Sequence, residues 1–71
     1  MLNLYDYSYS RSEWEALIDE YIFSERNRKI VKRKLLDGIT FEALAEEFDL
    51  SVQQTKTIVG QSKTRLLSVI K

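Results

Sequence analysis

The chain has 71 residues, with 11 basic and 11 acidic side chains and a formal net charge of zero. This length predicts one domain with a core of modest size. The chain contains no cysteine and no histidine, which excludes disulfides, a zinc finger and histidine-based catalysis. No apolar run approaches the roughly 18 residues that a membrane span needs, and no signal-peptide pattern is present, so we expect a cytoplasmic protein with no membrane partner.

Charge is distributed unevenly along the chain. Residues 1–24 hold one cation and five acids, a net charge of −4, and residues 25–71 carry the compensating +4. Six cations with no acid between them follow one another in the second of these segments: Arg26, Arg28, Lys29, Lys32, Arg33 and Lys34. DNA-binding domains usually carry a basic footprint, so any such footprint in this neutral chain is expected to be local.

The N-terminal residues 1–11 show no helical period, which predicts an irregular arm. Its tyrosines either pack onto the helices or contact a partner: Tyr5, Tyr7 and Tyr9. Ser12 and Glu15 fit an S-x-x-E capping box, and an apolar stripe at helical spacing follows them. The stripe comprises Trp14, Leu17, Ile18, Tyr21 and Ile22. A first supporting helix is therefore predicted over about residues 13–23.

A second supporting helix is predicted over about residues 25–37, with Ser24 as its N-cap and Gly38 in left-handed conformation just past its end. The six cations lie on its outer faces. They form a solvated surface, contact phosphates, or pair with acids of the first helix such as Asp19 and Glu20. The candidates for phosphate contact are Arg28, Lys32 and Arg33.

Residues 40–70 have the pattern of a helix-turn-helix. Thr40 is a candidate N-cap for a helix over about 41–48, whose apolar face comprises Phe41, Leu44, Ala45 and Phe48. Asp49 stands where the chain must reverse, and Asp tolerates left-handed geometry better than most residues. Ser51 and Gln54 then fit a second capping box, which opens a long helix over about 52–70.

The first turns of this last helix carry residue types that suit base edges in the major groove. Glutamine can pair with adenine, lysine with guanine or phosphate, and threonine with bases or the thymine methyl group. No acid occurs after Asp49. Each of these residues taken singly is more often a solvent-facing side chain, but together they favour recognition of DNA. The candidate DNA contacts are Ser51, Gln53, Gln54, Lys56, Thr57, Gln61 and Lys63.

The acidic face of the preceding helix has the opposite character. Glu42, Glu46 and Glu47 would repel phosphate, so we expect this face to point away from DNA. Catalysis has little support, because the sequence holds no glycine-rich loop, no nucleophile–base pair and no metal-ligand spacing. We therefore expect neither an enzyme nor a bound cofactor or metal.

The stretch from Arg28 to Leu66 resembles region 4 of the sigma-70 family of bacterial transcription initiation factors. Residues 36–51 echo the family's order of a glycine (Gly38), a Ser/Thr cap (Thr40), a Glu (Glu42), an apolar–Ala step and a Ser that opens the recognition helix. The resemblance implies a small all-α, four-helix domain whose last helix reads a promoter −35 element. It also implies contact with the β-subunit flap of RNA polymerase, in a bacterial or phage setting.

Three functions remain open at the level of sequence. The first is a small DNA-binding transcriptional regulator that resembles an isolated sigma region 4. The second is a protein-interaction module that binds RNA polymerase or another transcription factor without DNA contact, which zero net charge favours. The third is a homodimer, for which Leu67 and Ile70 are candidate interface residues.

Overall fold

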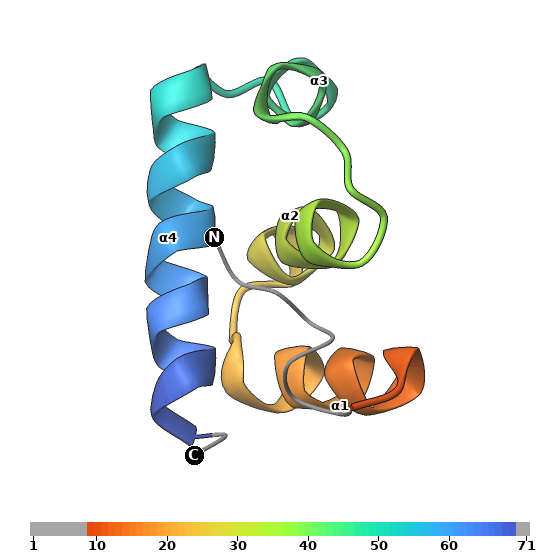
Figure 1. Cartoon of the computed structure of the whole chain (residues 1–71). Coiled ribbons are helices and arrows are strands. Elements are labelled where there is room, and N and C mark those ends of the chain that lie inside the picture. The colour runs from red at the N-terminus through yellow and green to blue at the C-terminus, as the bar shows by residue number, and fades with distance from the viewer. Residues whose placement is uncertain (1–8, 70–71) are drawn as a thin grey trace.

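The computed structural model describes residues 9–69. This part of the chain folds into four helices and contains no strand: α1 (Arg11–Tyr21), α2 (Glu25–Leu35), α3 (Phe41–Glu47) and α4 (Val52–Val69). The predicted all-α class is thus confirmed. The first three helices all lie on one side of α4, which stands as a straight column beside them (Figure 1). The predicted roles of Tyr5, Tyr7 and Ile70 concern positions outside the described residues.

The start of α1 differs from the prediction. Ser10, not Ser12, is the N-cap: its hydroxyl accepts from the Glu13 backbone N–H at 3.2 Å, and the Glu13 carboxylate accepts from the Ser10 N–H at 3.1 Å. The predicted box of Ser12 with Glu15 is therefore wrong. The two S-x-x-E patterns overlap, and the Ser10 register leaves Glu15 free to accept a hydrogen bond from Arg11 at 3.2 Å.

The residue just before this cap packs onto α1. The ring of Tyr9 meets that of Trp14 edge-on, with 5.3 Å between the ring centroids and an interplanar angle of 73°. Trp14 itself is buried. Edge-to-face pairs of this kind are favourable beyond the area that they bury. Of the two alternatives for the tyrosines, the structure therefore shows packing onto the helices for Tyr9.

Both predicted caps of the middle helices are confirmed. The Ser24 hydroxyl accepts from the Asn27 N–H at 3.3 Å, and the Thr40 hydroxyl accepts from the Ala43 N–H at 3.2 Å. Gly38 has a φ of 71°, the left-handed conformation predicted for it. Beyond it, the Ile39 N–H donates to the Arg33 carbonyl in the last turn of α2 at 3.1 Å.

The turn between α3 and α4 is as tight as the sequence predicts. Asp49 has a φ of 55°, and the Leu50 N–H donates to the Ala45 carbonyl at 2.8 Å. Ser51 and Gln54 form the predicted capping box, with the Gln54 side chain accepting from the Ser51 N–H at 2.9 Å and the Ser51 hydroxyl accepting from the Gln54 N–H at 3.0 Å. The capping box thus closes the start of α4, and the Leu50 N–H bond ties the turn to the end of α3.

The core consists of two clusters that share α2 and α4. One joins α1 to the C-terminal half of α4 through the buried residues Ile18, Ile22, Val31 and Leu66. The other joins α3 to the N-terminal half of α4 through Ile30, Leu44 and Val59. The neighbours Ile30 and Val31 of α2 serve different clusters, so α2 and α4 form the common spine. Leu66 is the last buried residue of α4 in this core, and Val69 at the end of the helix is 41% exposed.

Candidate nucleic-acid interface

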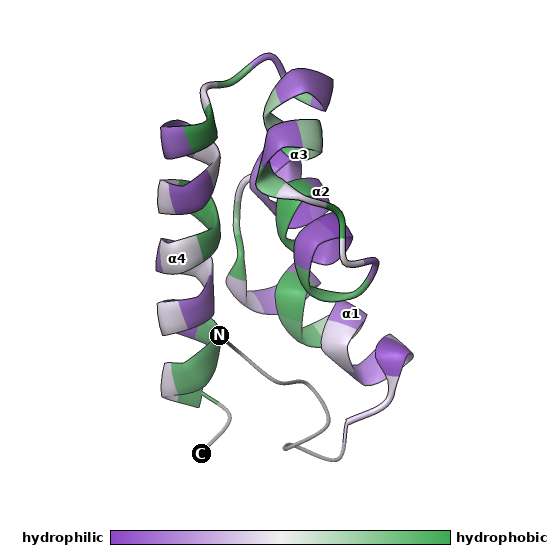
Figure 2. Cartoon of the chain, turned by 45° about the horizontal axis from the view of Figure 1, so that its top comes forward, coloured by the Kyte–Doolittle hydropathy of each residue, from purple (hydrophilic) through white to green (hydrophobic). Residues whose placement is uncertain are grey.

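The outward side of α4 is an uncovered polar surface. Its buried positions are Thr55, Val59, Ser62 and Leu66, and these face the other three helices, as the hydrophobic edge of α4 in Figure 2 shows. The opposite side carries exposed, uncharged polar residues: Gln53, Thr57, Gln61, Thr64 and Ser68. No acid occurs in Val52–Val69. This outward side is long, regular and free of groups that repel phosphate.

The predicted DNA contacts on α4 differ in how available their side chains are. Gln53, Lys56 and Gln61 are exposed, and Lys63 is half-buried. Within residues 9–69, the amide groups of Gln53 and Gln61 make no side-chain hydrogen bond. The Thr57 hydroxyl donates to the Gln53 carbonyl at 3.0 Å, so Thr57 presents mainly its methyl group and the remaining acceptor capacity of its oxygen.

Ser51 and Gln54 are engaged with each other in the capping box of α4. A glutamine that pairs with adenine uses its carbonyl oxygen and its amide group together. The Gln54 oxygen already accepts from a backbone N–H, which occupies one of its two acceptor sites and fixes the orientation of its amide. Gln53 therefore suits a bidentate contact with adenine better than Gln54 does.

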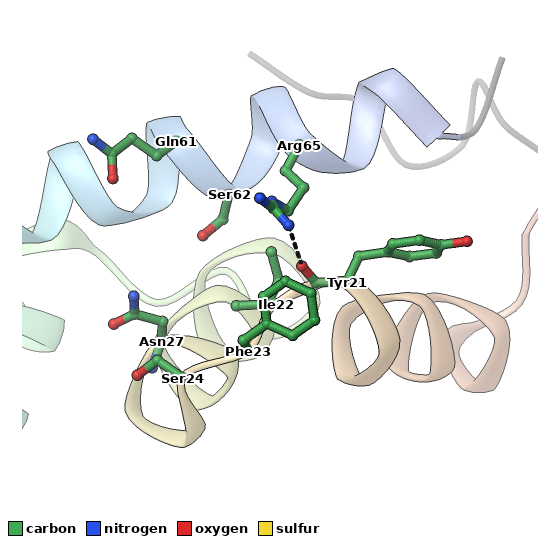
Figure 3. A pocket seen from close by; sticks show the side chains of 8 residues that line it. All are labelled: Tyr21, Ile22, Phe23, Ser24, Asn27, Gln61, Ser62 and Arg65. Carbon is green, nitrogen blue, oxygen red and sulfur yellow. Dashed lines mark hydrogen bonds between the residues drawn. The ribbon is translucent and has the colours of Figure 1, made fainter.

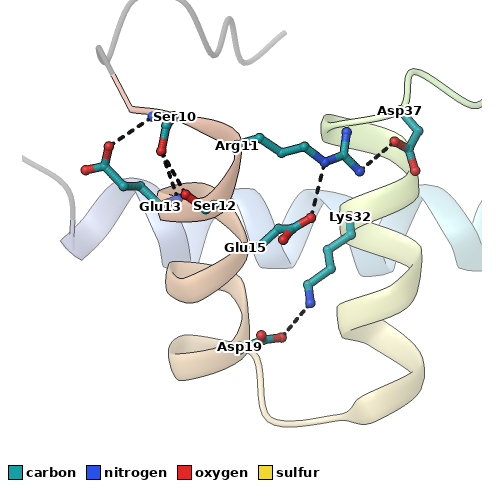
Figure 4. A network of polar contacts seen from close by, with 8 residues as sticks. All are labelled: Ser10, Arg11, Ser12, Glu13, Glu15, Asp19, Lys32 and Asp37. Atoms are coloured by element: carbon teal, nitrogen blue, oxygen red, sulfur yellow. Dashed lines mark hydrogen bonds and ion pairs between the residues drawn. The ribbon is translucent and has the colours of Figure 1, made fainter.

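The three α2 residues predicted to contact phosphates are all engaged within the molecule. Lys32 pairs with Asp19 at 2.7 Å, as Figure 4 shows, and Arg33 pairs with Glu47 at 2.9 Å. The Arg28 side chain donates to the Ile22 carbonyl. The sequence left open whether these cations are solvated, contact phosphates or pair with acids of the first helix. For Lys32, the structure shows pairing with Asp19 of α1.

A second ionic contact links α1 to the end of α2. Arg11 bonds to Asp37 at 2.8 Å and to Glu15 at 3.2 Å (Figure 4). The pKa of the Arg11 guanidinium is raised above its ordinary value, first by the hydrogen bond to Asp37 and then by the charge of that carboxylate. A raised pKa means that the Arg11 guanidinium stays charged at every pH below the ordinary pKa of arginine, so its own titration does not weaken this contact there. It therefore brings no pH dependence near neutrality.

Lys56, a predicted DNA contact, converges beside α4 with Lys34, a cation that the sequence did not assign to the interface. The Lys34 ammonium lies 4.3 Å from the centroid of the Phe41 ring, and that of Lys56 lies 5.8 Å from the same centroid. Lysines from α2 and α4 are thus gathered on one aromatic ring of α3. The only signal in the sequence was the membership of Lys34 in the cationic block, because Phe41 itself was expected to serve the apolar face.

The opposite flank of the first turns of α4 also carries a cation. A hollow of about 350 Å³ opens there, lined by Arg26, Leu50, Ser51, Gln53, Gln54, Thr57 and Ile58. At 100° per residue, Lys56 and Ile58 project from α4 about 200° apart. Lys34 and Lys56 therefore lie on one flank and Arg26 on the other. A helix in the major groove has a phosphate backbone on each side of it, which matches this arrangement.

A further hollow, of about 240 Å³, lies nearer the C-terminal half of α4, against the α1–α2 connection (Figure 3). Arg65 closes one end of it, where its guanidinium donates to the Tyr21 carbonyl at a long 3.5 Å and lies 5.1 Å from the centroid of the Phe23 ring. Phe23 is 73% exposed, because α1 ends at Tyr21 and not at residue 23 as predicted. Single exposed hydrophobic side chains are common on protein surfaces, and this ring lies against the Arg65 guanidinium.

No helix within residues 9–69 is long and apolar enough to cross a bilayer. The same residues contain no group of three or more carboxylates arranged to hold a metal ion. No protein-family model, curated protein or solved structure matches the chain.

Proposed function

We propose that this protein is a small DNA-binding transcriptional regulator that resembles an isolated sigma region 4 and places α4 in the major groove of duplex DNA. The observation that supports this proposal most is the outward side of α4, which is polar, free of acids and covered by no other described helix. The tight turn before α4 leaves its first turns accessible. The major groove is wide enough to admit one α-helix.

The proposal assigns distinct tasks to the residues of the first turns. Gln53 pairs with a base, since its amide is exposed and unengaged within the described chain. Lys56 and Lys34 contact one phosphate backbone, and Arg26 contacts the other. Lys63 adds a further cation along α4. A regulator of this kind acts in the cytoplasm, needs no cofactor and catalyses no reaction.

The first test is an amide NMR titration with a generic DNA duplex at low and at moderate salt. We expect shifts at Gln53, Lys56, Thr57 and Lys63 that weaken as salt rises, because phosphate contacts release counterions. The double variant Lys56→Glu/Lys63→Glu should abolish these shifts. Lys29→Glu is the control, since Lys29 is an exposed α2 cation that pairs with Glu25 at 3.9 Å. Binding that the double variant retains would contradict the role of α4.

Specific observations also favour the second candidate, a protein-interaction module that binds RNA polymerase or another transcription factor without DNA contact. Each cation of the α2 block already makes an interaction within the described chain. The exposed Phe23 ring beside the hollow of Figure 3 provides an apolar contact. This function would be favoured if the protein gave no shifts with DNA at low salt, yet co-eluted with polymerase in a manner that Phe23→Ala abolished.

A further inference from the structure

The hollow beside the first turns of α4 combines an apolar floor with a polar rim. Leu50 and Ile58 provide the floor, and both pack against the core cluster of α2, α3 and α4. Gln53 and Thr57 stand at the rim on the outward side of α4, and Arg26 reaches the rim from α2. Because the floor is anchored on the core and the turn before it is held by a capping box, the hollow is a preformed feature.

The position of the hollow restricts what can occupy it when α4 lies in DNA. Among the groups that base pairs present in the major groove, the C5-methyl group of thymine is the one apolar group, and it lies beside a hydrogen-bond acceptor, thymine O4. An apolar floor suits the methyl group. The adjoining amide of Gln53 suits the hydrogen-bonding edge of the same or the next base pair.

Arg26 adds a charge that matches the same ligand. Its Nε atom donates to the Asn27 side chain at 3.2 Å, and Arg26 is exposed. The terminal amino groups of the guanidinium form no ion pair within residues 9–69. A guanidinium at the edge of a groove-facing hollow is complementary to the phosphate that follows a base seated there.

We propose that the hollow formed by Leu50 and Ile58 accepts the C5-methyl group of a thymine, with Arg26 on the adjacent phosphate, so that α4 prefers A·T pairs at this step. This inference rests on the proposed function. It goes beyond that function by stating which base pair the N-terminal turns of α4 select and which apolar side chains select it.

The ligand itself provides the sharpest test, because deoxyuridine differs from thymidine only by the missing methyl group. Two short A·T-rich duplexes of identical sequence, one with thymidine and one with deoxyuridine, are compared by fluorescence anisotropy at the same low salt concentration. We expect the thymidine duplex to bind roughly fourfold more tightly, the ratio that corresponds to burying one methyl group at about 0.8 kcal/mol.

Two protein variants show whether the preference comes from the hollow. Ile58→Val removes one methyl group from the floor while keeping a β-branched side chain, and it should bring the ratio between the two duplexes close to one. Arg26→Gln is the matched control at the rim. It should weaken binding to both duplexes equally, reduce the salt dependence and leave their ratio unchanged. Circular dichroism of both variants establishes that they are folded.

The outcomes separate this inference from the proposed function. A thymidine preference that Ile58→Val removes supports the inference. Equal binding to both duplexes, or a preference that Ile58→Val leaves intact, overturns it while DNA binding by α4 stands. Binding to neither duplex at low salt overturns both, and the hollow would then have to be tested with apolar peptides.

Discussion

Thr55 places a hydroxyl group on the buried face of α4. Its side chain is fully buried, and its hydroxyl donates to the Ser51 carbonyl at 2.9 Å. That carbonyl also accepts the backbone N–H of Thr55 at 3.0 Å. The Thr55 hydroxyl thus has a hydrogen-bond partner. If the hydroxyl were removed, the Ser51 carbonyl would still accept the backbone N–H of Thr55. The methyl group, and not the hydroxyl, is expected to stabilise the core at this position.

A pair of substitutions at Thr55 tests this division. Thr55→Val keeps the shape and should leave the free energy of unfolding unchanged or raise it by up to about 1 kcal/mol, since the polar atom leaves the core. Thr55→Ser keeps the hydroxyl and should lower stability by about 1 kcal/mol, through loss of a buried methyl group. Urea denaturation of both variants measures the difference. A destabilised Val variant with an unaffected Ser variant would reverse the assignment.

Asp49 adopts a backbone conformation that favours glycine, with a φ of 55°. Left-handed geometry costs most L-residues about 1–2 kcal/mol, and Asp somewhat less. We expect Asp49→Gly to raise the free energy of unfolding by roughly 0.5 kcal/mol and Asp49→Ala to lower it by roughly 1 kcal/mol. Thermal unfolding checks both values. A stabilised Ala variant would show that the turn does not need this geometry.

At the scale of single elements, the two glycines have opposite roles. Gly38 has a φ of 71° where α2 ends, whereas Gly60 lies inside α4 in helical conformation. A Cβ at either position would meet nothing within 4 Å. The conformation of the backbone, and not a close contact, therefore decides what each glycine contributes.

Replacing each glycine by alanine should change stability in opposite directions. Gly38→Ala imposes left-handed geometry on an L-residue and should cost about 1 kcal/mol or more. Gly60→Ala should raise stability by roughly 0.5–1 kcal/mol, because glycine is a poor helix former and the site is open. Differential scanning calorimetry of both variants gives the comparison. If Gly60→Ala lowered the stability, the added methyl group would have to clash with a neighbouring atom, contrary to the open space found at Gly60.

The α2 helix turns its cations in different directions, so that one lysine pairs with α1 and another lies over an aromatic ring of α3. Lys32 pairs with Asp19 of α1, whereas Lys34 lies over Phe41 together with Lys56. Lys34→Gln should weaken DNA binding and lower the slope of log affinity against log salt by about 0.9, the value for one phosphate contact. Lys32→Gln should leave that slope unchanged. Fluorescence anisotropy over a salt series compares them, and equal slopes for both variants would remove Lys34 from the interface.

At the scale of the whole molecule, neutral net charge and local basicity coexist because the ion pairs lie away from the outward side of α4. Asp19, Glu47 and Asp37 each neutralise a cation of the supporting helices. The acid-free α4 keeps its own cations, among them Lys56 and Lys63. Non-specific attraction to DNA should accordingly be weak and easily screened by salt.

Association of two copies is the other property of the whole molecule to test. Leu67 is 39% exposed near the end of α4. If it forms the predicted dimer interface, light scattering should show dimers, and Leu67→Glu should convert them to monomers without loss of helicity. Ala16→Glu is the control, because Ala16 is an exposed position of α1. Leu17→Glu would not serve, since Leu17 packs on the core. A monomer at high concentration would remove the dimer hypothesis.

The helices, three of their caps and the left-handed conformations of Gly38 and Asp49 could be predicted from the sequence alone. These features depend on interactions between residues at most a few positions apart, such as the contact of Thr40 with the Ala43 N–H, or on the backbone preference of one residue, as at Gly38. The capping pattern alone did not predict which serine caps α1. There two overlapping capping boxes were compatible with the sequence, and contacts of Arg11 and Tyr9 accompany the one that forms.

Which cations are left unpaired by acids depends on contacts between helices that are far apart in the sequence. Lys32 and Lys34 are equivalent members of one basic stretch in the sequence, yet one meets Asp19 and the other meets Phe41. The hollow between Arg26 and Ile58 likewise joins residues of different helices. Such juxtapositions depend on how helices cross and on where each side chain ends, which periodicity does not specify. The physical reason is that charge pairing and cavity shape are properties of distances across the fold, whereas caps and helical faces are properties of neighbouring residues.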